Sequence, residues 1–286
     1  MSRRYPGEDP SETPARNTIN MKSWIAASAV VALLIVPLAA QSYSAFGAPR
    51  TAAVSPASFS DADLTSLMTT LDRLVAGKQP DDAAWQFARR LQTGRLTKAQ
   101  ESRVLTHLDE IAASRPDMTG LIAGPKKMIS KLTVGKMAPE IAGKDLEGRP
   151  FRLSDYRNKV VLLVFTTDWC AICRAYAPYE RFLLDKYARW PFALLGVESG
   201  SSRDAARQAH AASPLSNRAW WDEPRAGESS GPIAEAWNVI GWPATYLIDG
   251  NGIIQFVDLR EESLLMAVRQ LVEAQADLDL KSQRVK

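Results

Sequence analysis

The stretch VVLLVFTTDWCAIC (residues 160–173) holds the two features that decide the fold class. Residues 160–165 are all apolar, which is typical of a strand buried on both faces of a parallel sheet. The stretch ends in Cys170 and Cys173, and the chain has no other cysteine. We therefore expect a buried strand that leads into a Cys-x-x-Cys pair at the start of a helix.

The placement of this pair between a strand and a helix favours redox chemistry. The first cysteine lies at the helix N-terminus, where free amide groups and the helix dipole stabilise a thiolate. The second lies one turn further on, close enough to form a disulfide or to resolve a mixed disulfide. Cys170 is therefore the candidate catalytic nucleophile, and Cys173 is the candidate resolving thiol.

A Cys-x-x-Cys pair also occurs in zinc sites and as a structural bridge. A structural zinc site takes four ligands, and the sequence has no second cysteine pair, so we expect no metal. A purely structural disulfide stays open as an alternative, although a bridge across so short a loop contributes little stability.

Strands and helices alternate after residue 135, which indicates an α/β domain. The expected elements after the cysteine pair are strands at residues 192–197, 244–248 and 253–257, and helices after Cys170, near 203–212 and near 264–272. The composition is that of an ordinary globular chain, with 46% hydrophobic residues over 286 positions. Its formal net charge of +3 is too mild to indicate a nucleic-acid partner.

Residues 61–132 show apolar side chains at helical spacing and predict four helices. The third opens with Thr-Lys-Ala-Gln at residues 97–100, which is a capping-box pattern. We interpret these stripes as the core of a small bundle, because amphipathic stripes normally face a core. A role for this segment in docking a partner stays open.

The N-terminal region indicates export. Residues 24–40 are an apolar run without charge, preceded by Lys22. The run is slightly short for a membrane span and slightly long for a signal-peptide core, so both interpretations stay open, as do translation starts at Met1 and Met21. We expect a disordered lead (1–20), a signal peptide or membrane anchor (21–48) and a linker (49–60). The protein would then be periplasmic or otherwise extracytoplasmic, attached to the inner membrane through residues 24–40 if they are kept.

Several short stretches stand in a fixed order around the cysteine pair. They are GKMAP at residues 135–139, DLEG at 145–148, LSDYR at 153–157, Pro178, and WPAT at 242–245. With Trp169 directly before Cys170, they resemble the thioredoxin superfamily, in particular its exported TlpA-like branch with a redoxin-type domain. The resemblance implies a thioredoxin fold over residues 135–276, preceded by the small all-α segment and followed by a tail (277–286).

The resemblance also implies how the site is built. The peptide bond before Pro243 is expected to be cis and to lie opposite the disulfide. Trp169, Trp242 and Pro243 are then candidate substrate-binding residues, because the backbone at Trp242 can pair with an extended substrate. Six residues before the first cysteine, where the family has a buried acid, this chain has Val164. Deprotonation of Cys173 therefore needs another base.

The function implied by the resemblance is that of a thiol-disulfide oxidoreductase acting on extracytoplasmic proteins, and we expect it to work as a disulfide reductase. Its partners are expected to be protein disulfides or dithiols and a second redox protein, because the sequence has no flavin or nicotinamide motif and no cofactor is expected. A peroxiredoxin-like peroxidase is an alternative, since Thr167 and Cys170 fit the end of that family's motif, although Leu163 replaces its proline. A non-catalytic, redox-sensitive adaptor is the other. Catalysed disulfide exchange in trans separates an enzyme from an adaptor.

Overall fold

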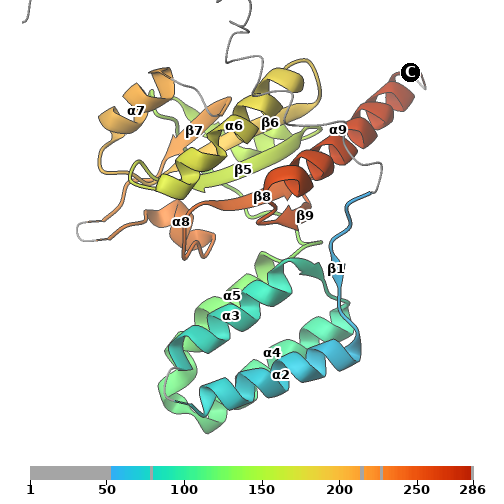
Figure 1. Cartoon of the computed structure of the whole chain (residues 1–286), viewed down its shortest axis with the longest axis vertical. Coiled ribbons are helices and arrows are strands. Elements are labelled where there is room, and N and C mark those ends of the chain that lie inside the picture. The colour runs from blue at the N-terminus through green and yellow to red at the C-terminus, as the bar shows by residue number, and fades with distance from the viewer. Residues whose placement is uncertain (1–52, 78–79, 213–215, 226–227, 285–286) are drawn as a thin grey trace, which may run out of the picture. The chain divides into compact units, whose positions relative to one another are not determined.

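The computed structural model describes residues 53–77, 80–212, 216–225 and 228–284, and all of them belong to one compact unit (Figure 1). The expected lead at residues 1–20 and the expected signal peptide or anchor at 21–48 lie outside the described residues. Among the helices that are described, none is long and apolar enough to cross a membrane.

A five-stranded mixed sheet carries the α/β part of the chain, in the strand order β7-β6-β5-β8-β9. The strands are β5 (Val160–Thr166), β6 (Phe192–Glu198), β7 (Arg218–Trp221), β8 (Ala244–Ile248) and β9 (Ile254–Val257). The pairs β5–β6 and β6–β7 are parallel, whereas β8 runs antiparallel to both β5 and β9. Together with the helices that pack on it, this sheet forms the thioredoxin-like fold that the resemblance implied.

Strand β5 lies at the centre of the sheet, which explains its unbroken apolar run. Val160, Leu162 and Val164 belong to one buried cluster, and Val161, Leu163 and Phe165 belong to another. Successive side chains of a strand point to opposite faces, so a strand covered on both sides needs apolar residues at every position.

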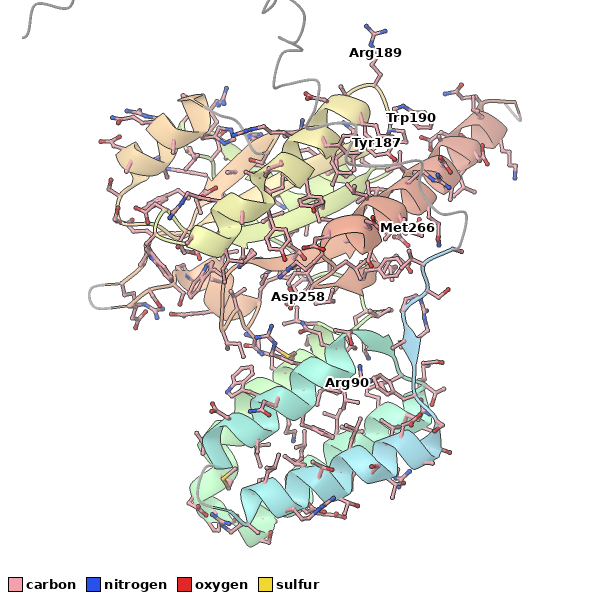
Figure 2. All side chains as sticks on the ribbon, viewed as in Figure 1. Arg90, Tyr187, Arg189, Trp190, Asp258 and Met266 are labelled. Atoms are coloured by element: carbon pink, nitrogen blue, oxygen red, sulfur yellow. A yellow bond between two sulfur atoms is a disulfide. The ribbon has the colours of Figure 1, made fainter. Side chains whose placement is uncertain are left out.

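Helices α6 (Ala171–Lys186) and α9 (Glu261–Arg284) cover one face of this sheet, as Figure 1 shows. Leu183 of α6 and Val268 of α9 pack in the same cluster as Leu162 of β5. Beyond the end of α6, the rings of Tyr187 and Trp190 meet edge to face with centroids 6.1 Å apart (Figure 2). Helix α6 is therefore fixed along its length, and its first turn is held in place at the end of β5.

Shorter elements complete the α/β part. They are the hairpin strands β3 (Ala142–Lys144) and β4 (Pro150–Arg152), the 3-10 turn η2 (Leu153–Tyr156), α7 (Arg203–Ala212) and α8 (Pro232–Ala236). Asp145, in the hairpin turn, is fully buried and accepts hydrogen bonds from the Arg149 backbone N–H at 2.7 Å and from Arg218 Nε at 2.8 Å. This carboxylate ties the hairpin to β7.

The preceding segment contains the four expected helices. They are α2 (Asp61–Val75), α3 (Pro80–Gln92), α4 (Lys98–Ser114) and α5 (Thr119–Lys131), with the 3-10 turn η1 (Pro116–Met118) before α5. The predicted capping box is present, since the Thr97 side chain accepts from the Gln100 N–H and the Gln100 side chain accepts from the Thr97 N–H. The buried faces of these helices join the same cluster as Phe165 of β5. Gln92 at the end of α3 donates to the Tyr246 hydroxyl of β8 at 2.9 Å.

Two details differ from the sequence-based expectations. The segment is not purely helical, because β1 (Ala57–Ser58) pairs in parallel with β2 (Gly94–Arg95), and β1 lies within the expected linker. Helix α9 continues to Arg284, past residue 276, where the domain was expected to end. Its last turns carry a mixture of polar and apolar residues, and this weak pattern hides the helix end.

Candidate active site

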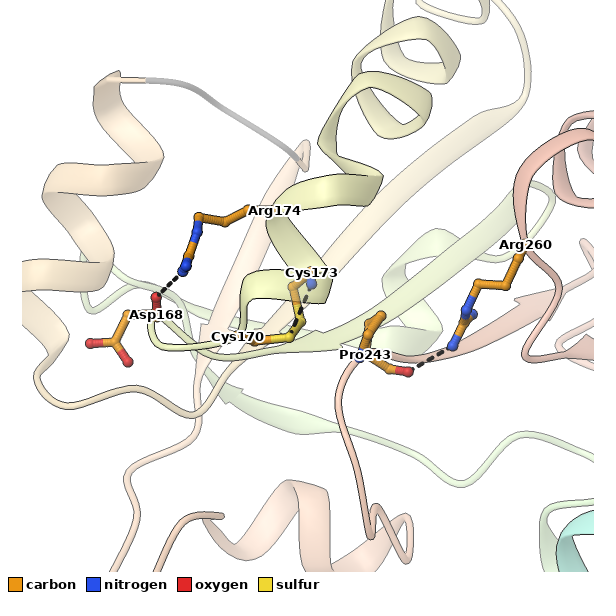
Figure 3. Close-up of a disulfide and its surroundings, with 6 residues drawn as sticks. All are labelled: Asp168, Cys170, Cys173, Arg174, Pro243 and Arg260. Carbon is orange, nitrogen blue, oxygen red and sulfur yellow. Dashed lines mark hydrogen bonds between the residues drawn. A yellow bond between two sulfur atoms is a disulfide. The ribbon is translucent and has the colours of Figure 1, made fainter.

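Cys170 and Cys173 form a disulfide at the start of α6, with their Cα atoms 5.3 Å apart. Cys170 is the N-cap residue of the helix, and its Sγ accepts a hydrogen bond of 3.0 Å from the Cys173 backbone N–H (Figure 3). A sulfur at this position faces the free amide groups and the positive end of the helix dipole. The geometry thus stabilises a thiolate on Cys170 once the disulfide is opened.

The two cysteines are buried, but their surroundings differ. Cys170 is 5% exposed and Cys173 is 8% exposed, whereas Trp169 and Ile172 beside them are 57% and 59% exposed. Exposed large apolar side chains next to a reactive group are typical of a surface that receives a partner. Cys173 instead lines a partly open cavity.

The loop before β8 lies beside the disulfide (Figure 3). The Trp242–Pro243 peptide bond is cis, as expected. The indole rings of Trp169 and Trp242 meet edge to face, with centroids 5.4 Å apart. The structure therefore brings the predicted site residues Trp169, Trp242 and Pro243 together around the cysteine pair.

Arg260, which the sequence analysis missed, holds this loop in place. It donates to the Pro243 carbonyl oxygen at 2.7 Å (Figure 3). It also donates to the Thr245 hydroxyl at 2.7 Å. Its guanidinium carbon also lies 5.4 Å from the centre of the Tyr176 ring on α6, within cation–π range. Arg260 thereby links the helix that carries the cysteines to the loop that carries Pro243.

The loop between β5 and Cys170 is fixed by Asp168. Its carboxylate accepts hydrogen bonds from the backbone N–H and the hydroxyl of Ser201, and its carbonyl oxygen accepts from Arg174 at 2.9 Å. Partial burial raises the pKa of Asp168, but the Ser201 hydrogen bonds outweigh burial and leave this pKa below its usual range. Asp168 therefore stays charged beside the site at neutral pH.

A cavity of about 200 Å³ lies behind the disulfide, between α6, β6 and α7. Its polar lining side chains are Thr166, Thr167, Asp168, Cys173, Arg174, Glu180, Glu198, His210 and Ser216. The hydroxyl of Thr167 is buried and has no hydrogen-bond partner among the described residues. A cavity of this size with polar groups in its lining has room for several water molecules, which would pair with such a group.

Two carboxyl groups in this cavity have raised pKa values. Burial is the main cause for Glu180, whose pKa rises to about 8; the charge of Glu198 adds to the rise, and Arg181 and Arg260 oppose it. Burial also raises the pKa of Glu198 to about 7, with a smaller contribution from Asp168. Both groups therefore titrate near neutral pH, where most carboxyl groups are fully ionised.

The sequence analysis missed both glutamates, although one signal for Glu180 was present. The buried side of α6 consists of Cys173, Ala177, Glu180 and Leu183, at helical spacing. A glutamate within such an apolar stripe is unusual, because ionisable residues are seldom buried without a partner. Glu198 ends the apolar strand β6 and gave no comparable signal.

The tryptophans divide between core and site. Trp220 and Trp237 are fully buried, and Trp220 stacks on Phe151 with ring centroids 3.9 Å apart. Trp221 is partly buried and lines a surface hollow together with Trp169. Across the described residues, no group of three or more His, Cys, Asp or Glu side chains is arranged to hold a metal ion.

The arrangement has the parts required for thiol-disulfide exchange. Cys170 has a stabilised sulfur next to an exposed apolar surface, and Cys173 can close the disulfide from within. The cavity behind Cys173 adds groups that bind and release protons near neutral pH.

Comparison with known proteins agrees with this chemistry. Residues 134–257 match the AhpC/TSA family. Over 124 residues, the chain is 32% identical to the thiol-disulfide oxidoreductase ResA of Geobacillus kaustophilus, covering 43% of this chain and 68% of ResA. It is 31% identical over 121 residues to the thioredoxin-like protein YneN of Bacillus subtilis, covering 42% of this chain and 68% of that protein. A crystal structure of the thioredoxin domain of a Bacteroides vulgatus thiol-disulfide oxidoreductase aligns with a TM-score of 0.44 at 25% identity, over 50% of this chain and 99% of that domain.

Proposed function

The chain belongs to the AhpC/TSA family, among the thioredoxin-like thiol-disulfide oxidoreductases, and from this premise we propose that it reduces disulfides in extracytoplasmic proteins through Cys170 and Cys173. The observation that carries the proposal is the disulfide at the N-terminus of α6, beside the loop of Trp242 and Pro243. In the first step, the Cys170 thiolate attacks a substrate disulfide. In the second step, Cys173 attacks Cys170 Sγ, which releases the reduced substrate and closes the Cys170–Cys173 bond.

The charges near Cys173 favour the reducing direction, against the stabilisation of a Cys170 thiolate by the helix N-terminus. A dithiol that is strongly stabilised as a thiolate makes its disulfide a strong oxidant, as in DsbA. Around Cys173, the carboxyl groups of Asp168, Glu180 and Glu198 face only Arg174 and His210 in the cavity lining. This excess of acidic groups disfavours a thiolate on Cys173 and so favours the disulfide, which is the product of a reductase turnover.

The proposed substrate surface lies around Trp169, Ile172, Trp242 and Pro243. The exposed apolar side chains of Trp169 and Ile172 would contact a substrate protein, and the backbone at Trp242 would pair with an extended segment of it. A second redox protein would return electrons to the Cys170–Cys173 disulfide. The apolar run of residues 24–40 supports export, either as a cleaved signal or as a retained anchor.

Trapping of the mixed disulfide tests this mechanism. Cys173→Ser leaves the nucleophile but removes the resolving thiol, so it should accumulate a covalent complex with a disulfide-bonded model protein. The complex should run as a shifted band on a non-reducing gel and disappear with dithiothreitol. Cys170→Ser is the matched control and should trap nothing.

The same variants separate the alternatives. If Cys173→Ser traps no partner and the wild type reduces no disulfide in trans, the bridge is structural and the adaptor interpretation replaces the enzyme. If the wild type consumes hydrogen peroxide catalytically while failing to reduce protein disulfides, the peroxidase interpretation replaces the reductase.

A further inference from the structure

The second exchange step needs a thiolate on Cys173, and the position of Cys173 on α6 does not supply the hydrogen bond that would stabilise one. Only a thiolate attacks a disulfide, so the Cys173 thiol must lose its proton. The hydrogen bond from the helix N-terminus goes to the Cys170 sulfur and comes from the Cys173 backbone N–H itself. Cys173 is buried and lines the cavity, so the cavity offers its proton a way out.

In place of the buried acid that the thioredoxin superfamily has at this position, the lining of the cavity contains Val164. Val164 of β5 lies opposite Gly196 of β6 in the sheet register, and both line the cavity. A side-chain carbon on Gly196 would lie 3.0 Å from Ala219 Cβ, 3.3 Å from Ser216 Oγ and 3.6 Å from Glu198 Oε1, so this position adjoins the Glu198 carboxyl group. With an apolar residue at position 164, the acidic groups in this lining come from α6 and β6 as Glu180 and Glu198 and from the loop as Asp168.

Glu180 and Glu198 lie on different elements but share this space with the thiol. Glu180 is on the same buried stripe of α6 as Cys173, seven residues further on, which places the two backbones about 10 Å apart at 1.5 Å per residue. Glu198 pairs in register with Thr166, at the strand end that leads to the cysteines. Water in the cavity would connect these groups, and the unpaired hydroxyl of Thr167 is suited to hold one such water.

We propose that Glu180 and Glu198 act together as the proton acceptor for Cys173, through water in the cavity that all three residues line. The inference rests on the proposed oxidoreductase function and deepens it. In the mixed disulfide, the ionised member of the carboxyl pair takes the proton of the Cys173 thiol. The Cys173 thiolate then attacks Cys170 Sγ, the Cys170–Cys173 bond forms, and the bond from Cys170 to the substrate breaks. The substrate leaves as a thiolate and takes a proton from solvent, and the carboxyl pair later releases its proton to solvent.

The charges that face the pair suit this role. Burial of both carboxyl groups, together with the charge of Glu198 near Glu180, keeps them from ionising fully below neutral pH, so at neutral pH the pair holds about one proton and can take up another. Asp168 adds a negative charge from the loop before α6, and Arg174 a positive one from α6. Arg181 and Arg260 lower the pKa of Glu180. Burial lowers the pKa of His210 on α7, so it stays largely neutral in the range where the pair titrates.

A single-turnover reaction separates the two chemical steps. The reduced full chain, kept in detergent, is mixed in a stopped-flow instrument with 5,5′-dithiobis(2-nitrobenzoate), whose coloured thiolate leaves once when Cys170 attacks and once when Cys173 resolves. Cys173→Ser should release only the first equivalent, which assigns the phases. For Glu180→Gln, the first phase should be unchanged and the second slowed by roughly 100-fold, a typical size for loss of a general base.

The pH profile and matched variants complete the test. The wild-type second phase should rise with pH through an inflection between about 7 and 8, and in Glu180→Gln only the inflection of Glu198, at about 7, should remain. Glu198→Gln should move the inflection of Glu180 to lower pH, since Glu180 then loses the repulsion that raises its pKa. Glu180→Asp should recover most of the rate, and Asp185→Asn, an exposed carboxyl on the same helix, should behave as wild type. An unchanged second phase in Glu180→Gln overturns the inference while leaving the oxidoreductase intact, whereas absence of both phases in the wild type overturns the proposed function itself.

Discussion

The buried carboxyl of Glu180 makes the stability of the oxidised protein depend on pH, and Glu180→Gln should remove that dependence. The pKa of Glu180 is about 8 in the folded protein, against an ordinary value of 4.5. Between these two pH values, the unfolded chain has lost the proton and the folded chain still holds it. The folded state therefore binds more protons, and the free energy of unfolding falls as pH rises.

The magnitude follows from the two pKa values. Stability from this group is complete below pH 4.5, falls by about 1.4 kcal/mol per pH unit, and is fully lost above pH 8. The total loss is about 5 kcal/mol as an upper bound, because Glu198 is coupled to the same site. Glutamine cannot ionise, so Glu180→Gln should become more stable than the wild type by an amount that grows steadily from pH 4.5 to 8.

Urea denaturation of both proteins, with the disulfide intact, at half-unit steps from pH 4.5 to 8.5 measures this difference. The slope of unfolding free energy against urea should be the same in both proteins, which keeps the comparison two-state. Asp185→Asn, which replaces an exposed carboxyl on the same helix outside the cavity, provides the control. A wild-type-to-Glu180→Gln difference that is flat with pH would refute the reasoning, since Glu180 would then ionise as it does in water.

Three further changes test other parts of the structure. Asp145→Ala should destabilise the fold by about 3 kcal/mol, because it leaves buried donors of the β3–β4 turn and Arg218 unpaired; equal urea midpoints would contradict this. Burial raises the pKa of Asp145, but its hydrogen bonds and the charges of Arg218 and Arg149 outweigh burial and hold this pKa below the ordinary 3.8. The stability that Asp145 contributes is therefore present above about pH 4 and is lost as the pH falls further. The Ala variant should lack this loss of stability at acid pH. Arg260→Ala removes the donors to Pro243 and Thr245 and should cost about 2 kcal/mol and slow exchange, so unchanged denaturation and turnover would count against its anchoring role. Trp169→Ala should change stability by less than about 0.5 kcal/mol, since the side chain is exposed, but raise KM for a protein disulfide about tenfold; an unchanged KM would remove Trp169 from the substrate surface.

The sequence predicted those features that depend on residues close together in the chain. The apolar run of β5 and the cysteine pair at the start of α6 follow from strand and helix periodicity, and both are observed. The cis bond before Pro243 came from the resemblance to the thioredoxin superfamily rather than from any local pattern, because most X-Pro bonds are trans.

The cavity could not be predicted, because it depends on contacts between distant segments. Val164, Gly196 and Glu198 meet only through the parallel pairing of β5 with β6, and Glu180 reaches the same space from α6. Val164 in the sequence already indicates that Cys173 lacks the family's acid. The replacement could not be predicted, because a glutamate seven residues after a cysteine comes close to the same cavity only when the helix is packed on the sheet.

The tryptophans show the same limit. Trp220 and Trp221 are adjacent in sequence, yet one is fully buried and the other lines a surface hollow. Successive side chains of a strand point to opposite faces of the sheet. Strand β7 has four residues, which are too few for the sequence pattern to show which of the two side chains points inward.

The measurement that tests the central claim most directly is the reduction potential of the Cys170–Cys173 pair. The full chain in detergent is equilibrated in buffers of defined thiol and disulfide ratio, and the free thiols are then counted by alkylation and mass spectrometry. The account predicts reversible cycling of both cysteines, with a midpoint near or below about −230 mV, as expected of a disulfide reductase. A midpoint near about −120 mV would reverse the direction of electron flow, and a pair that cannot be reduced while the protein stays folded would contradict the account.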